Sequence, residues 1–190
     1  MLVNTKNNMS KILFSGGGTL GSVSPLLAIK ENLENKNFEF CWVGTENGPE
    51  QKIIEDKSIS FYSIKTAKFR RYFSWQNFLA PVRFVFAFFQ ALKILLKERP
   101  DLCITAGGFV SVPVHFAAYL KGVPTWVHQQ DIKVGLANKL MVKMATKVTV
   151  ALEESREEFS RDDIDCIGNP VREEIYQGNR EEARNIFNIS

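Results

Sequence analysis

Four short polar or glycine-rich segments stand where predicted strands end, and their residue types suit the binding of phosphate and sugar groups. They cover residues 16–22, 106–111, 128–131 and 168–172. Glycine lets the backbone turn tightly and bring N–H groups and a helix N-terminus close to an anion. In a parallel α/β sheet, ligands bind beyond the carboxyl ends of the strands. The sequence therefore predicts one binding cleft built from these four loops.

The first loop also fits the GxGxxG pattern of dinucleotide-binding folds, with Gly16, Gly18 and Gly21. A nicotinamide site expects an acidic residue at the end of the second strand. That strand ends at Thr45, and Glu46 follows only as a late substitute. The pattern thus favours a phosphate-binding turn over a nicotinamide site.

The second glycine loop has the same character at the end of a different strand. Two glycine turns that face one cleft suit a pyrophosphate or a sugar between them. Each glycine pair could instead serve only the turn from strand to helix.

Apolar runs of strand length alternate with helical patterns along the chain. Strands are expected at residues 11–15, 38–44, 59–64, 101–105, 124–128, 147–151 and 164–168. Helical patterns follow them, among others at residues 23–34, 49–56, 112–120, 135–144 and 153–159. This alternation predicts an α/β fold, a Rossmann-like parallel sheet with helices on both faces.

Composition narrows the class of protein. With 190 residues and 45% hydrophobic content, the chain fits one domain and a short tail. A net charge of +3 is too balanced to indicate nucleic acid as a partner. The thiols Cys41, Cys103 and Cys166 lie in apolar runs, so we expect buried free cysteines, a reducing cytosolic compartment and no cysteine-ligated metal.

The segment at residues 65–99 is rich in both Phe and basic residues. Basic residues interrupt its apolar run, so a membrane-spanning helix is not expected. Aromatic and basic side chains together favour contact with an anionic membrane surface. That contact is predicted for Lys68, Phe69, Arg70, Arg71, Phe73, Trp75 and Phe78. For residues 84–96, a crossover helix whose Phe side chains pack on the sheet is the alternative.

Several motifs occur together in one order from about Lys11 to the C-terminus: GGTLGSVSPLLAIKENL, WVGT, AGGFVSVP, GVPTWVHQQDIKVGLANKLMVKMATKV and GNPVREEI. With them the chain resembles the N-terminal domain of the MurG family. These bacterial transferases add N-acetylglucosamine to undecaprenyl-pyrophosphoryl-N-acetylmuramoyl-pentapeptide (lipid I) to form lipid II. The resemblance implies the N-terminal half of a GT-B glycosyltransferase, and inverting transfer from UDP-N-acetylglucosamine without metal or cofactor. It also implies peripheral attachment to the cytoplasmic face of the cell membrane.

In the family the N-terminal domain receives the acceptor, and its glycine loops cradle the lipid pyrophosphate. Substrate contacts are therefore expected from the two glycine loops and from positions that match the family's donor-side residues. They are Gly17, Gly18, Thr19, Leu20, Gly21, Ser22, Gly107, Gly108, Phe109, Asp131, Asn138 and Arg172. An exposed arginine without a ligand is the alternative for Arg172.

Two loops depart from the family pattern. Where the family has GGTGGH, this chain has Leu20 in place of a glycine and Ser22 in place of the histidine. Where the family has HEQN, this chain has HQQD. Inverting transfer needs a base for the acceptor hydroxyl, and neither Ser22 nor Gln129 suits that role. A catalytic role is therefore expected for His128 or Asp131. The alternatives are a hydrogen-bonded strand-end imidazole for His128 and helix caps for Asp131 and Ser22.

The domain boundaries expected from this resemblance are a disordered N-terminus at residues 1–10, an acceptor-binding domain at 11–172, and a linker at 173–190 toward an absent donor domain. The chain would then be half of a transferase, one subunit of a split enzyme that pairs with a separate donor-domain chain, or a non-catalytic protein that binds polyprenyl-linked sugars. The implied partners are UDP-N-acetylglucosamine, lipid I and an anionic membrane surface, with no nucleic acid.

Overall fold

The computed structural model describes residues 9–66, 80–175, 178 and 180–187. Its strands are β1 (Ser10–Ser15), β2 (Phe38–Thr45), β3 (Ser60–Ile64), β4 (Leu102–Thr105), β5 (Thr125–Gln129), β6 (Lys147–Val150) and β7 (Ile164–Cys166). The α-helices are α1 (Ser24–Leu33), α2 (Glu50–Asp56), α3 (Ala80–Glu98), α4 (Ser111–Leu120), α5 (Leu136–Val142) and α6 (Arg180–Phe187). Two 3-10 helices, η2 (Glu153–Glu158) and η3 (Glu173–Ile175), complete the set within these ranges.

The strands form one sheet in the order β3-β2-β1-β4-β5-β6-β7, and every neighbouring pair is parallel. The chain builds outward from β1 to β3, then returns to place β4 on the other side of β1. The strand order therefore reverses between β1 and β4. In doubly wound sheets, ligands bind at this reversal, outside the carboxyl ends of the strands.

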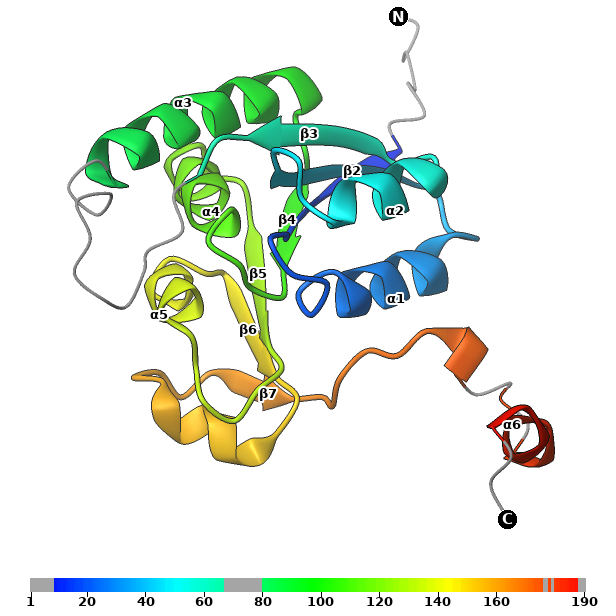
Figure 1. The fold of residues 1–190 in the computed structure, drawn as a ribbon. Helices are drawn as coiled ribbons and strands as arrows, with labels where there is room; N and C mark the ends of the chain where they lie inside the picture. The colour runs from blue at the N-terminus through cyan, green and yellow to red at the C-terminus, as the bar shows by residue number, and fades with distance from the viewer. Residues whose placement is uncertain (1–8, 67–79, 176–177, 179, 188–190) are drawn as a thin grey trace, which may run out of the picture.

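Helices cover both faces of the sheet, with α1 and α2 on one side and α3, α4 and α5 on the other (Figure 1). The central strand shows why its sequence is a continuous apolar run. Leu13 packs in the cluster under α3 and α4, whereas its neighbour Phe14 packs in the cluster under α1, and both are fully buried. Successive strand residues point to opposite faces, so both faces need apolar side chains. The predicted fold class is confirmed.

The observed elements differ from the expected ones in two places. The pattern after β6 folds as the 3-10 helix η2. The segment expected as a linker contains η3 and α6. Residues 1–8 lie outside the described residues, as do the seven side chains predicted to contact the membrane, which fall within 67–79.

One cysteine expectation is wrong. Cys41 and Cys103 are buried, but Cys166 is exposed. β7 is the edge strand of the sheet, and only its first residue, Ile164, packs in the core. The apolar run around Cys166 therefore does not report burial at that position.

Helix α3 has a buried side and an exposed side, and two of its phenylalanines, Phe84 and Phe88, pack against the core as the crossover-helix alternative expected. Ala87, Ala91 and Leu95 pack in the core on one side of the helix. On the other side, Phe86 and Phe89 are 66% and 60% exposed. In the part of the chain that the structure describes, no helix is long and apolar enough to cross a membrane.

Candidate functional site

Three of the four predicted loops meet at the carboxyl edge of the sheet, beside the point where the strand order reverses. They line a cavity of about 220 Å³ that we call the central pocket. Asp131 is its one charged lining residue in the described ranges. The lining comprises Thr19, Gly21, Ser22, Ala106, Gly107, Gly108, Gln129, Gln130, Asp131, Gly135, Ala137 and Asn138.

The two glycine loops are in direct contact at Gly17 and Gly108. A Cβ atom on Gly108 would lie 3.0 Å from the carbonyl oxygen of Gly17, and the φ angle of Gly108 is +94°. Both the contact and the left-handed backbone require a residue without a side chain. The neighbouring Gly107 has φ +113° and faces Asn138. The glycines of the second loop thus allow the first loop to approach.

Glu50 anchors the first glycine loop, and the sequence reasoning missed it. Its side chain is fully buried. The carboxylate accepts hydrogen bonds from the backbone N–H of Gly18 at 3.1 Å, and from the N–H and hydroxyl of Thr45 at 2.6 and 2.5 Å. A Cβ atom on Gly17 would lie 2.0 Å from Glu50 Oε1. The N–H of Gly18 is therefore occupied by the protein's own carboxylate.

A second missed residue, Gln130, ties the loops together. Its side-chain amide donates to the carbonyl oxygens of Gly21 at 3.1 Å and of Ala106 at 3.2 Å. One side chain from the third loop thus holds the first loop and the end of β4 in register. The signal in the sequence was its place in HQQD, between the candidate catalytic residues His128 and Asp131.

Gln129 and Asn138 form a buried amide network behind Gln130. Gln129 Nε2 donates to the carbonyl oxygen of Asp131 at 2.7 Å, and Asn138 Nδ2 donates to Gln129 Oε1 at 2.6 Å. The carbonyl oxygen of Asp131 thus fixes the orientation of the Gln129 amide, and Gln129 Oε1 fixes that of the Asn138 amide. Asn138 Oδ1 remains buried without a hydrogen-bond partner, beside Gly107. The pocket therefore has a free acceptor suited to a ligand hydroxyl or N–H.

The structure separates the two candidate catalytic residues. His128 is fully buried, its Nδ1 lies 2.9 Å from Thr149 Oγ1, and burial lowers its pKa, which a hydrogen bond with Asn169 partly opposes. Asp131 is exposed and lines the central pocket, while its backbone carbonyl accepts a hydrogen bond from Ser155 Oγ at 3.0 Å. Of the two, Asp131 is the one that a ligand in the pocket can reach.

The helix-cap alternatives are both wrong. Ser22 Oγ donates to the carbonyl oxygen of Thr19 at 3.4 Å, and α1 has Val23 as its N-cap without a side-chain hydrogen bond. Asp131 lies ahead of Gly135, which is the N-cap of α5.

The remaining predicted residues lie around or away from the pocket. Leu20 is exposed on the first loop, and Phe109 packs in the cluster that includes Met141 and Val148. Arg172 lies 3.6 Å from Glu174, which lines a groove with Lys30 near the end of α1. Since α1 ends at the amino edge of the sheet, the structure does not bring Arg172 to the central pocket.

A search of family models identifies residues 12–150 as a glycosyltransferase family 28 N-terminal domain. Among named relatives, the UDP-N-acetylglucosamine--N-acetylmuramyl-(pentapeptide) pyrophosphoryl-undecaprenol N-acetylglucosamine transferase of Clostridium kluyveri is 42% identical over 90% of this chain and 49% of its own length. A Bacillus cereus transferase of the same name, numbered 2, is 40% identical over 96% of this chain and 52% of its own length. This chain spans about half the length of these relatives.

Solved structures agree with this assignment. MurG of Acinetobacter baumannii superposes with a TM-score of 0.72 at 25% identity, over 86% of this chain and 46% of that one. The UDP-GlcNAc 2-epimerase of Neisseria meningitidis shares the fold alone, with a TM-score of 0.60 at 13% identity over 84% of this chain and 46% of that one. By the match of its family model over most of its length, the chain belongs to glycosyltransferase family 28, as an N-terminal domain of that family.

Proposed function

We propose that this chain supplies the acceptor-binding half of an N-acetylglucosamine transferase. The reaction moves N-acetylglucosamine from UDP-N-acetylglucosamine to undecaprenyl-pyrophosphoryl-N-acetylmuramoyl-pentapeptide. The observation that carries the proposal is 42% identity, along 90% of the chain, to a transferase named for that reaction.

The central pocket is the proposed place of sugar transfer. Its walls are backbone and neutral polar groups apart from Asp131, which suits a sugar with many hydroxyls. The buried Oδ1 of Asn138 would accept a hydrogen bond from a sugar hydroxyl or acetamido N–H. Asp131 is the proposed base that takes the proton of the acceptor hydroxyl, because its side chain is exposed in the pocket.

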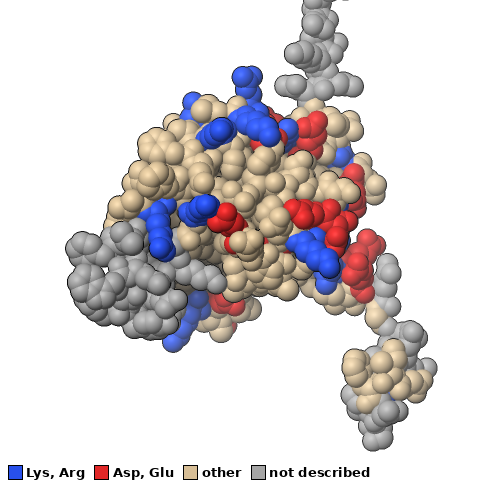
Figure 2. Space-filling view, turned by 45° about the horizontal axis from the view of Figure 1, so that its top comes forward, with Lys and Arg blue, Asp and Glu red and all other residues tan. Residues whose placement is uncertain are grey.

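The proposed location of the protein is the cytoplasmic face of the cell membrane, to which the outer face of α3 would attach it. Its exposed apolar side chains are Val82, Val85, Phe86, Phe89 and Leu96. From Ala80 to Lys97 the helix has basic residues and no acidic one. Figure 2 shows tan surface at the upper left of the molecule, without Asp or Glu, and blue Lys and Arg side chains beside it. Apolar side chains among cations favour an anionic lipid surface.

The transfer reaction itself tests the proposed function. The chain would be mixed with the separately expressed C-terminal half of the Clostridium kluyveri relative, radiolabelled UDP-N-acetylglucosamine and a short-chain lipid I analogue. We expect label in the lipid extract, and a rate at least about a hundredfold lower for Asp131→Asn. Asp162→Asn, at an exposed acid outside the pocket lining, is the matched control. If the chain neither retains the lipid I analogue nor supports transfer, the proposed function is wrong.

A further inference from the structure

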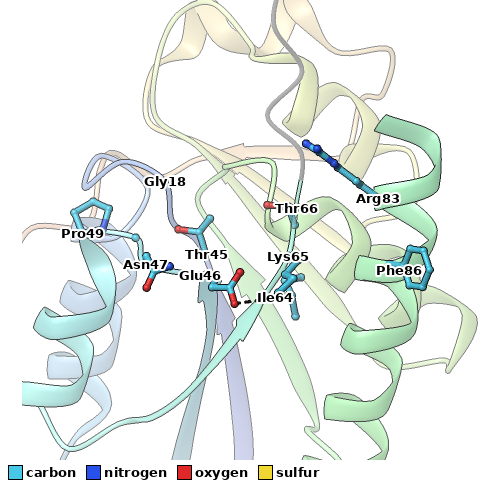
Figure 3. Close-up of a pocket in the computed structure, with 11 residues that line it drawn as sticks. Gly18, Thr45, Glu46, Asn47, Pro49, Ile64, Lys65, Thr66, Arg83 and Phe86 are labelled. Carbon is cyan, nitrogen blue, oxygen red and sulfur yellow. Dashed lines mark ion pairs between the residues drawn. The ribbon is translucent and has the colours of Figure 1, made fainter. Parts of the chain in front are cut away.

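A second and larger cavity lies on the other side of the first glycine loop. Its volume is about 650 Å³, within the range of small-molecule sites. We call it the α3 pocket, because α3 forms one wall and the turn after β2 forms the other (Figure 3). Its lining comprises Gly18, Thr45, Glu46, Asn47, Gly48, Pro49, Ile64, Lys65, Thr66, Arg83 and Phe86.

The α3 pocket holds the positive charge that the central pocket lacks. Lys65 and Arg83 line it, and Glu46 is the opposing carboxylate on its surface. Glu46 pairs with Lys65 at 3.6 Å, whereas no acidic side chain in the described ranges pairs with Arg83. Figure 3 shows Arg83 extending from α3 toward the space above Thr66. A guanidinium without a carboxylate partner is suited to a phosphate group.

Glu50 restricts where an anion can sit in this pocket. Its buried carboxylate already occupies the N–H groups of Gly18 and Thr45 on the wall opposite α3. That wall therefore offers a nearby negative charge in place of free donors. A phosphate is favoured on the α3 side, next to Arg83.

The pocket also opens onto the apolar surface of α3. Phe86 lines the pocket and belongs to the exposed apolar face described above. A ligand that fits both features has an anionic head and a long apolar tail. The first glycine loop separates the two cavities, with Gly18 on one side and Thr19 and Gly21 on the other. A head group bound near Arg83 would thus lie next to the loop that borders the central pocket.

We propose that the α3 pocket binds the pyrophosphate end of a polyprenyl chain, with Arg83 on the phosphates and Phe86 on the first isoprene units. The assignment rests on the proposed function, since the acceptor there is a polyprenyl pyrophosphate. It deepens that function by placing the pyrophosphate on a cationic side chain of α3 rather than on the backbone N–H groups of the glycine loops.

Calorimetric titration with farnesyl pyrophosphate, a soluble polyprenyl pyrophosphate, tests the assignment. Two matched pairs on one helix separate the pocket from general attraction to α3. Arg83→Gln is compared with Lys93→Gln, and Phe86→Ser with Phe89→Ser, because the second member of each pair is exposed but does not line the pocket. We expect about a tenfold loss of affinity, or about 1.4 kcal/mol, for Arg83→Gln, and less than about twofold for Lys93→Gln. Phe86→Ser should likewise weaken binding more than Phe89→Ser.

Equal losses within both pairs would overturn the assignment, since they would indicate adsorption to the helix surface. Inorganic pyrophosphate that binds as tightly as farnesyl pyrophosphate would overturn the lipid part and leave a site for free phosphate. The proposed function fails separately. A chain that neither retains the lipid I analogue nor supports transfer, but still binds farnesyl pyrophosphate through Arg83, would reject the function and keep the pocket. Transfer that Arg83→Gln does not slow would reject the pocket alone.

Discussion

Glu50 and Gly18 lie 32 positions apart in the chain, yet the buried carboxylate of Glu50 accepts the backbone N–H of Gly18 at 3.1 Å. This bond joins the first glycine loop to the start of α2. The same carboxylate holds Thr45 at the end of β2. One acidic side chain thus fixes the loop that borders both cavities.

We expect Glu50→Ala to destabilise the protein by about 1–3 kcal/mol, because it leaves the half-buried N–H groups of Gly18 and Thr45 without their carboxylate partner. Urea unfolding monitored by circular dichroism would measure the change. Glu55→Ala is the control on the same helix, since Glu55 is exposed and its carboxylate accepts a hydrogen bond from Gln51. Equal stability of the two variants would show that Glu50 is not the anchor.

Gly17→Ala should cost a similar free energy for a related reason. The new Cβ would lie 2.0 Å from Glu50 Oε1, so the carboxylate must move and give up hydrogen bonds. In a Glu50→Ala background the obstacle is gone, and the same substitution should cost less. A double-mutant cycle from urea unfolding measures this coupling. Strictly additive costs would contradict the contact, and Gly135→Ala, with nothing within 4 Å of its new Cβ, serves as the tolerated control.

The fold could be predicted from the sequence because both faces of the sheet are covered. Residues such as Leu13 and Phe14 must then both be apolar, which leaves a short unbroken run between helical patterns. The glycine loops could be predicted for a different, local reason, because a tight turn from strand to helix needs glycine.

The remaining site features depend on contacts between distant segments. Nothing near Glu50 in the sequence indicates that Gly17 and Gly18 will enclose its carboxylate. The burial of His128 depends on Thr149 of the next strand, and the exposure of Cys166 depends on β7 being an edge strand. Local pattern cannot report which strand lies at an edge.

The stability of the protein should fall on acidification because of His115. This residue is buried in α4 with both ring nitrogens unpartnered, and burial lowers its pKa to about 3. In the unfolded chain the His115 imidazole binds a proton near pH 6.5, whereas in the folded state it stays neutral at that pH. The contribution of neutral His115 to the free energy of unfolding is therefore complete above about pH 6.5, and it falls by about 1.4 kcal/mol per pH unit from there down to about pH 3. Urea midpoints at pH 7 and pH 5 should differ less in His115→Leu than in the wild type; an equal difference would contradict this account.

Thiol accessibility should single out one cysteine of three. Burial raises the pKa of Cys41 to about 12 and also raises that of Cys103, whereas Cys166 is exposed. Thiolates react and buried thiols do not, so iodoacetamide at pH 8 should modify one site in the folded protein. Mass spectrometry should find no modification in folded Cys166→Ser, and three modifications in the wild-type protein unfolded in urea. Rapid labelling of Cys41 in the folded state would contradict the packing of β2.

Membrane attachment should depend on both apolar and basic side chains. Serine at Val85 and Phe89 removes exposed apolar surface from α3 without touching its core side, so sedimentation with anionic vesicles should fall while the unfolding midpoint stays.

Neutralising Lys68, Arg70 and Arg71, which the sequence places in the same aromatic and basic segment, should also reduce sedimentation, and more strongly at about 50 mM salt than at higher salt. Ser replacements at Tyr119 and Leu120, exposed at the end of α4, test whether any exposed apolar pair acts alike. Unchanged sedimentation in the α3 variant would reject this helix as the attachment surface, because no charge was altered in it and only the apolar contact was removed.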